Sequence, residues 1–349
     1  MHEPRNLRYK ADLGTAVVVA SLLVFPLLLT SAGIEAVAGT RSFSVTPEQE
    51  SSLSTLEKAK KRLALFDYTS SAVLSVERTL EKKSQKYSRE TIRLTIDDPL
   101  GQRGEFVQDI RFFRKSGEAA LPLVLVFPPF TGTQYLDTWS SGVFVQHGYH
   151  AAVIVPSESI MDLSRSLDHF DDLLIREVIV TRMCLDVLEA LPEVDGDRIY
   201  AYGISLGGIR ASLAFGVEPR IKKMAEVVGG GDIPGIIKDT LFSRLVKIRE
   251  NRMRLENLAT PEEVEKYLEA EMHMDPLDFA ILREPEDVIM VISDHDRFVP
   301  TTYQEKLRTA FSRPETGSYP SVIRSKRGHV LTALHYKKYI EKFVEFFEE

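Results

Sequence analysis

The sequence predicts an α/β protein whose doubly wound, mostly parallel sheet carries an inserted helical cap. From about residue 121 to the end of the chain, short apolar runs alternate with helix-like stretches. This alternation is typical of a parallel sheet with helices on both faces. A charge-rich, strand-free segment at about 231–275 interrupts it, and we interpret that segment as the cap. With 349 residues, the chain is long enough for one large domain with a substantial core.

The first part of the chain is an apolar segment with a basic flank. Residues 13–34 carry no charge and follow three basic residues. An apolar stretch of this length can span a bilayer, and the basic flank favours the cytoplasmic side. Residues 1–38 are therefore predicted to be a cleaved signal peptide or a transmembrane anchor. The rest of the chain would be exported to the periplasmic or extracellular side, tethered to the membrane by residues 13–34 if these stay uncleaved.

Residues 39–87 are predicted to be a helical extension, and residues 88–349 to be the main domain. Apolar residues recur near helical spacing over 46–66, and a second helical stretch is expected at about 71–82. The predicted strands of the main domain are 90–96, 106–113, 121–127, 151–155, 198–202, 225–228, 288–292 and 321–324, and the predicted long helices are 171–191 and 339–347.

Composition excludes several functional classes. The net charge of -7 and the absence of a Lys/Arg block argue against nucleic acid as a partner. The single cysteine, Cys184, excludes an internal disulfide, a cysteine-based zinc site and an iron–sulfur cluster. The histidines show no metal-ligand spacing. We therefore expect neither a metal nor a cofactor.

Residues 203–207 read Gly-Ile-Ser-Leu-Gly and lie between an apolar strand and a helix-compatible stretch. This is the strand–turn–helix context that a nucleophile elbow requires. The residues two before and two after Ser205 must be small, because strand and helix nearly touch there. Ser205 is therefore the candidate nucleophile. A serine hydroxyl needs a histidine as base and a carboxylate that orients this histidine.

Candidates for both partners follow later strands. The run 288–292 leads into Ser-Asp-His-Asp-Arg-Phe-Val-Pro at 293–300, and Gly-His at 328–329 follows the last short strand. Because parallel strands end at one edge of a sheet, these groups are expected near Ser205. His329 is the expected base, since His295 shares the loop of the acid and His335 falls on a predicted surface helix.

The motifs together resemble the α/β-hydrolase family, over about residues 88–349. In that family the acid loop commonly reads Gly-x-x-Asp-x-x-Val-Pro, and here Asp296 takes the acid position with Ser293 in place of the glycine. The late Gly-His pair also matches. The resemblance implies a triad of Ser205, Asp296 and His329. Asp294 and Asp232 remain the alternative acids.

The expected oxyanion hole departs from the family pattern. The family usually has His-Gly after its third strand, whereas this chain has Pro128 and Pro129 there. A proline has no N–H to donate. The resemblance still implies the N–H of Phe130 as one donor and that of Leu206 as the other.

These residues predict a serine hydrolase, a carboxylesterase acting on a small-molecule acyl ester. The same triad would serve an acyltransferase or a peptidase. The alternative from another class is a catalytically silent, membrane-tethered binding module on the same fold. The cap is expected to place an apolar roof over the acyl group, from Ile233, Ile236, Ile237, Leu241, Phe242, Leu245 and Val246.

Overall fold

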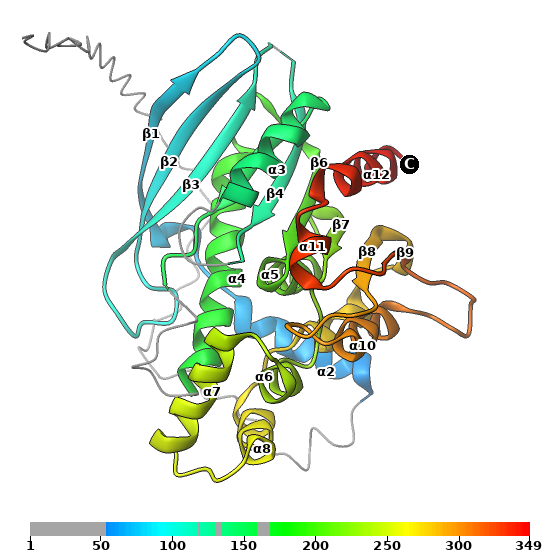
Figure 1. Cartoon of the computed structure of the whole chain (residues 1–349). Helices are drawn as coiled ribbons and strands as arrows, with labels where there is room; N and C mark the ends of the chain where they lie inside the picture. The colour runs from blue at the N-terminus through cyan, green and yellow to red at the C-terminus, as the bar shows by residue number, and fades with distance from the viewer. Residues whose placement is uncertain (1–53, 118, 130–134, 159–167) are drawn as a thin grey trace, which may run out of the picture.

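The computed structural model describes residues 54–117, 119–129, 135–158 and 168–349 (Figure 1). The predicted signal or anchor segment, the beginning of the extension and Phe130 lie outside these residues. Within the described ranges, none of the helices is long and apolar enough to cross a bilayer.

In the described residues, nine strands form one sheet in the order β1-β2-β3-β5-β4-β6-β7-β8-β9. The first four strands in this order pair antiparallel, and every pair from β5 to β9 is parallel. The strands are β1 (Val73–Lys83), β2 (Tyr87–Ile96), β3 (Phe106–Lys115), β4 (Leu121–Phe127), β5 (His150–Ile154), β6 (Val194–Ile204), β7 (Ile221–Val227), β8 (Val288–Ser293) and β9 (Ser321–Ser325). The continuous apolar runs of β4 and β8 match their burial, since each strand has a neighbour on both sides.

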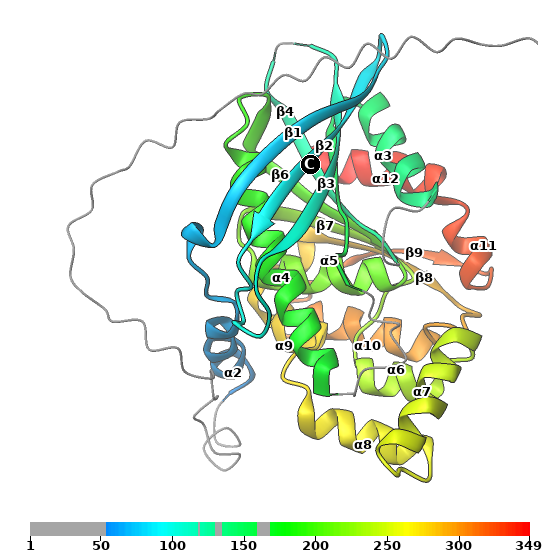
Figure 2. The same ribbon diagram turned by 90° about the vertical axis from the view of Figure 1, so that its left-hand side faces the viewer.

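Helices cover both faces of this sheet (Figure 2). One face packs against α3 (Tyr135–Gln146) and α12 (Tyr336–Glu348). The other face packs against α4 (Asp168–Glu189), α5 (Leu206–Val217) and α10 (Thr301–Phe311). The predicted doubly wound α/β fold is confirmed, and so are the eight predicted strands, with ends that differ by a few residues.

The cap is also present as predicted, between β7 and β8. It consists of α6 (Ile233–Asp239), α7 (Ser243–Leu255) and α8 (Pro261–Glu271). Two hydrogen bonds join it to the loop after β8: the Thr240 hydroxyl donates to the Phe298 carbonyl at 2.7 Å, and the Leu241 N–H donates to the Arg297 carbonyl at 2.8 Å. The cap is therefore fixed to the loop that carries the candidate acids.

The expectation of a helix at 71–82 is wrong, because this segment forms the edge strand β1. Val73, Val76 and Leu80 follow helical spacing, but Leu74, Val76 and Leu80 also lie on one face of an extended strand. Antiparallel pairing with β2 along nearly the whole strand satisfies the backbone in the extended form. Tertiary pairing thus overrides a local pattern that fits both structures.

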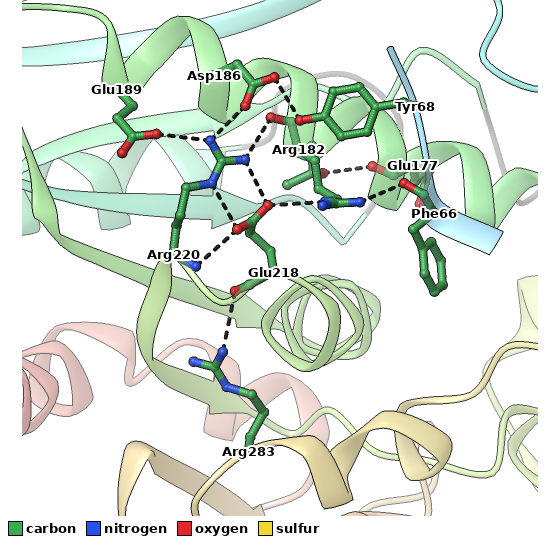
Figure 3. A network of polar contacts seen from close by, with 10 residues as sticks. Phe66, Tyr68, Glu177, Arg182, Asp186, Glu189, Glu218, Arg220 and Arg283 are labelled. Atoms are coloured by element: carbon green, nitrogen blue, oxygen red, sulfur yellow. Dashed lines mark hydrogen bonds and ion pairs between the residues drawn. The ribbon is translucent and has the colours of Figure 1, made fainter. Parts of the chain in front are cut away.

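In the described part of the extension the helical elements are short: α2 (Thr55–Arg62), η1 (Leu63–Phe66) and η2 (Ser70–Ala72). Polar contacts hold the segment from Phe66 onward on the domain (Figure 3). Arg182 on α4 donates to the Phe66 carbonyl at 2.6 Å. The Tyr68 hydroxyl donates to Asp186 at 2.7 Å, and Arg220 binds the other oxygen of Asp186 at the same distance. The segment before β1 is therefore docked along α4.

Candidate active site

Ser205 sits at the sharp turn between β6 and α5. Its backbone has φ 59° and ψ -126°, a conformation that a non-glycine residue rarely adopts. Its N–H donates to the Val227 carbonyl at 2.8 Å, which ties the turn to the neighbouring strand. The fold therefore holds the side chain in place through its backbone.

The glycines on either side of Ser205 permit this turn. A Cβ atom at Gly203 would lie 2.0 Å from the Gly207 carbonyl oxygen. A Cβ atom at Gly207 would lie 2.0 Å from the carbonyl oxygen of Phe127, at the end of β4. Both contacts are with backbone atoms, which cannot move aside as a flexible side chain can. The requirement for small residues, expected from the sequence, is confirmed.

Ser205, His329 and Asp296 form a hydrogen-bonded row. His329 Nε2 lies 2.9 Å from Ser205 Oγ, and His329 Nδ1 lies 2.7 Å from Asp296 Oδ2. An ionised carboxylate only accepts hydrogen bonds, so Nδ1 carries the proton and the Nε2 lone pair faces the hydroxyl. This is the tautomer in which a histidine can take a proton from serine.

The structure brings Asp296, and not the alternative acids, to His329. The carboxylate of Asp296 is fully buried, and its Oδ1 accepts the N–H groups of Phe298 at 2.8 Å and Val299 at 3.1 Å. Asp294 is exposed and forms an ion pair with Arg324. Asp232 caps α6 instead, accepting the N–H of Gly235 and pairing with Lys306.

Gln304 holds the carboxylate of Asp296 in place, and it was not among the residues predicted from the sequence. It is fully buried on α10. Its Nε2 donates to Asp296 Oδ2 at 2.9 Å and to the Val299 carbonyl at 2.7 Å, while its Oε1 accepts the Ser293 N–H at 3.0 Å. The amide therefore has one possible orientation and offers the carboxylate an N–H donor.

Replacing Gln304 by leucine is expected to lower kcat for ester hydrolysis about 10–100-fold with little change in KM. A hydrogen bond to a charged group is worth about 1.5–3 kcal/mol, and this one acts on the orientation of the acid rather than on substrate binding. Steady-state kinetics with a p-nitrophenyl ester measure both constants. Thr302→Leu, on the exposed side of the same helix, is the matched control, and a wild-type kcat in Gln304→Leu would contradict the positioning role.

The residues expected at the oxyanion hole are only partly described. Leu206 is the first residue of α5. The N–H groups of the first helical turn have no partner within the helix, so this N–H is available beside Ser205. Phe130 lies outside the described residues. The carbonyl of Pro128, two residues before it, accepts a hydrogen bond from buried Arg210 of α5 at 2.7 Å, and Glu177 holds the same guanidinium.

An apolar cavity of about 290 Å³ opens at Ser205 and His329. Its floor includes Leu206 and Ile209 of α5. Five residues of the cap region form the opposite wall, namely Ile233, Ile236, Ile237, Phe242 and Leu245. The predicted apolar roof therefore exists in part. Leu241 is instead exposed at 60%, and Val246 does not line the cavity.

A buried acid lies behind the elbow. Glu226 on β7 is only 1% exposed, and it accepts a hydrogen bond from the Ser212 hydroxyl at 3.2 Å. Burial raises the pKa of this carboxyl to about 7, because the charged form is removed from water. Its side chain also packs close to Gly208 and Gly229. Helix α5 thus packs on a carboxyl group that is neutral in mildly acidic solution.

Glu226→Gln is expected to flatten the pH dependence of folding stability between about pH 4.5 and 7. In this window the unfolded chain has released the proton that the folded protein keeps, so raising the pH favours unfolding, by up to about 1.4 kcal/mol per pH unit. The glutamine variant has no such proton. Urea unfolding at pH 5 and pH 8 measures the effect, and equal pH dependence in both proteins would contradict the assignment.

No protein-family model and no curated protein matches the sequence. Solved structures do match the fold. Acetyl xylan esterase 1 from a Thermoanaerobacterium species aligns with a TM-score of 0.61 and 14% identity, covering 84% of this chain and 93% of the esterase. An acetyl xylan esterase from a Paenibacillus species aligns with a TM-score of 0.60 and 17% identity, covering 83% of this chain and 93% of the esterase. The acylaminoacyl peptidase of Pyrococcus horikoshii aligns with a TM-score of 0.55 and 16% identity, covering 76% of this chain and 42% of the peptidase.

The strand order sets the positions of the three residues of the row. The mostly parallel sheet carries Ser205 after β6 and Asp296 after β8, and His329 begins α11 (His329–Ala333) beyond β9. At these identities the alignments describe how the chain is folded. The chain therefore has the α/β-hydrolase fold.

Proposed function

We propose that the protein is a serine hydrolase, a carboxylesterase that cleaves esters through an acyl-enzyme on Ser205. The observation that carries this proposal is the row of Ser205, His329 and Asp296, with distances of 2.9 and 2.7 Å. Its nucleophile sits on a strained turn at the mouth of a cavity. A hydrogen-bonded row of this kind can raise the reactivity of an otherwise weak hydroxyl nucleophile.

Each group has a defined part in the proposed reaction. Ser205 Oγ attacks the ester carbonyl while His329 Nε2 takes its proton, and Asp296 stabilises the imidazolium that forms. The N–H groups of Leu206 and Phe130 stabilise the tetrahedral oxyanion. His329 then donates the proton to the leaving alcohol. Water, activated by the same histidine, releases the acid, and no cofactor takes part.

We propose ester hydrolysis rather than peptide hydrolysis as the reaction. The two acetyl xylan esterases are covered over 93% of their length, whereas the chain spans 42% of the acylaminoacyl peptidase. A matched pair of substrates, the p-nitrophenyl ester and the p-nitroanilide of one acyl group, distinguishes the two reactions. We expect turnover of the ester and little turnover of the anilide.

A phosphonate probe tests the proposal directly. Incubation with a fluorophosphonate at neutral pH should give one covalent adduct, which peptide mass spectrometry maps to Ser205. The adduct should be lost in Ser205→Ala and His329→Ala. It should persist in His335→Ala, because His335 bonds to the Leu331 carbonyl, away from the row. A protein without any adduct would be a silent module on this fold.

Export is a separate part of the proposal. It is supported by the uncharged segment 13–34 and the basic residues before it. Fusion of residues 1–40 to a reporter that folds only outside the cytoplasm tests it. An active reporter is expected, and the size of the fusion shows whether the segment is cleaved.

A further inference from the structure

The cavity beside Ser205 contains almost no polar side chain. Of the described residues that line it, only Ser205 and His329 are polar, and none carries a carboxylate, an ammonium or a guanidinium group. A charged or strongly hydrogen-bonding substrate group would lose its water there without gaining a partner. An alkyl chain, in contrast, gains about 0.8 kcal/mol for each methylene removed from water.

The two ends of the cavity differ in exposure. On one side, Ile209 of α5 and Ile236 of α6 are each only 4% exposed. On the other side, Val330 and Leu334 of the α11 region line the cavity and are 52% and 51% exposed. The cavity wall from Ile209 and Ile236 is therefore buried, and the wall from Val330 and Leu334 is exposed. We call the first the closed end of the cavity and the second its open end.

This difference orients an ester. The leaving oxygen must face His329 Nε2, which protonates it. His329 begins α11, at the open end. The leaving alcohol therefore departs toward solvent, and the acyl chain points away from His329 into the closed end under α6.

We propose that the enzyme prefers an uncharged, linear acyl chain of about eight to ten carbons. This rests on the proposed ester hydrolysis at Ser205. The volume of about 290 Å³ covers both ends of the cavity and is roughly ten times the ~30 Å³ that one water molecule takes in the liquid. A methylene group is about as large as a water molecule, so a chain of about eight carbons fits and leaves room for the alcohol. The acetyl group named for two of the similar structures would leave most of this space empty.

A series of p-nitrophenyl esters from acetate to hexadecanoate tests the preference. The kcat/KM is expected to be at least about 100-fold higher for octanoate than for acetate, and to fall again beyond about twelve carbons, because the closed end is then full. Leu245→Trp, which narrows the cavity wall, should lower the octanoate-to-acetate ratio at least about tenfold. Leu241→Trp, on an exposed side chain of the same cap, should leave that ratio unchanged.

Binding gives a readout that does not need turnover. Titration of the Ser205→Ala protein with p-nitrophenyl octanoate and with the acetate should show tighter binding of the octanoate. A comparison of ethyl octanoate with octyl acetate separates the acyl from the alcohol side, and the wild-type protein is expected to prefer ethyl octanoate.

Two kinds of failure can be told apart. Hydrolysis that depends on Ser205 but favours acetate, or favours octyl acetate, would overturn the acyl-chain preference and leave the proposed function intact. Failure to hydrolyse any ester, together with the lack of a phosphonate adduct on Ser205, would overturn both.

Discussion

Replacing Ser205 by alanine is expected to lower kcat for ester hydrolysis by about 10⁴–10⁶-fold. Its Oγ atom is the only one in the proposed row that can form the acyl-enzyme, and it lies 2.9 Å from His329 Nε2. Alanine removes the oxygen and keeps the Cβ atom, so the turn between β6 and α5 can retain its backbone hydrogen bond to Val227. The measurement is single-turnover and steady-state hydrolysis of a p-nitrophenyl ester by wild type and variant.

Combining Ser205→Ala with His329→Ala tests whether these two residues act together or contribute independently to the rate. If Ser205 and His329 act as one unit, the double variant should be no slower than Ser205→Ala alone, because the base has nothing left to activate. If the rate losses of the two single variants multiply in the double variant, Ser205 and His329 do not act as one unit. His335→Ala, a change of the same type on a histidine outside the row, should keep the wild-type rate.

The sequence predicted the parallel core because its strands are continuous apolar runs, which local pattern alone can identify. The run at 121–127 is β4 from its first to its last residue. The edge strand β1 was missed, because its stability comes from pairing with β2 and not from its own pattern. An exposed edge strand buries little apolar surface, so its sequence shows only a weak pattern of apolar residues.

Some residues of the candidate site could likewise be predicted from local motifs, and others depend on tertiary contacts. Ser205 and His329 could be predicted because each follows a strand in a recognisable motif. The choice of Asp296 over Asp294 depended on the family pattern, and the 2.7 Å contact of Asp296 with His329 supports it. Gln304 depends on contacts that meet only in the folded chain. A sequence signal does exist, since this amide falls on the buried stripe of α10 with Leu307 and Phe311.

The environment of Asp296 makes a second large effect predictable. Asp296→Asn is expected to lower kcat about 10⁴-fold while leaving the fold intact. If the new side-chain oxygen keeps accepting the N–H groups of Phe298 and Val299, the NH₂ group must face His329 Nδ1. A donor at that position forces Nδ1 to accept, so the proton moves to Nε2. Nε2 can then no longer take the proton of Ser205.

The opposite orientation of the new amide is disfavoured, because it costs two hydrogen bonds and the preferred one costs one. With its oxygen toward His329, its NH₂ group would point at two backbone N–H donors, both left without an acceptor. In the preferred orientation only one donor loses its acceptor, because Gln304 Nε2 then faces the new NH₂ group. Gln304 cannot turn over to relieve this contact, since its Oε1 is held by the Ser293 N–H. The loss should therefore appear in kcat, with KM nearly unchanged. Asp294→Asn, two residues away in the same loop and paired with Arg324 on the surface, is the matched control. Equal losses in the two variants would mean that the loop, and not the carboxylate beside His329, sets the rate.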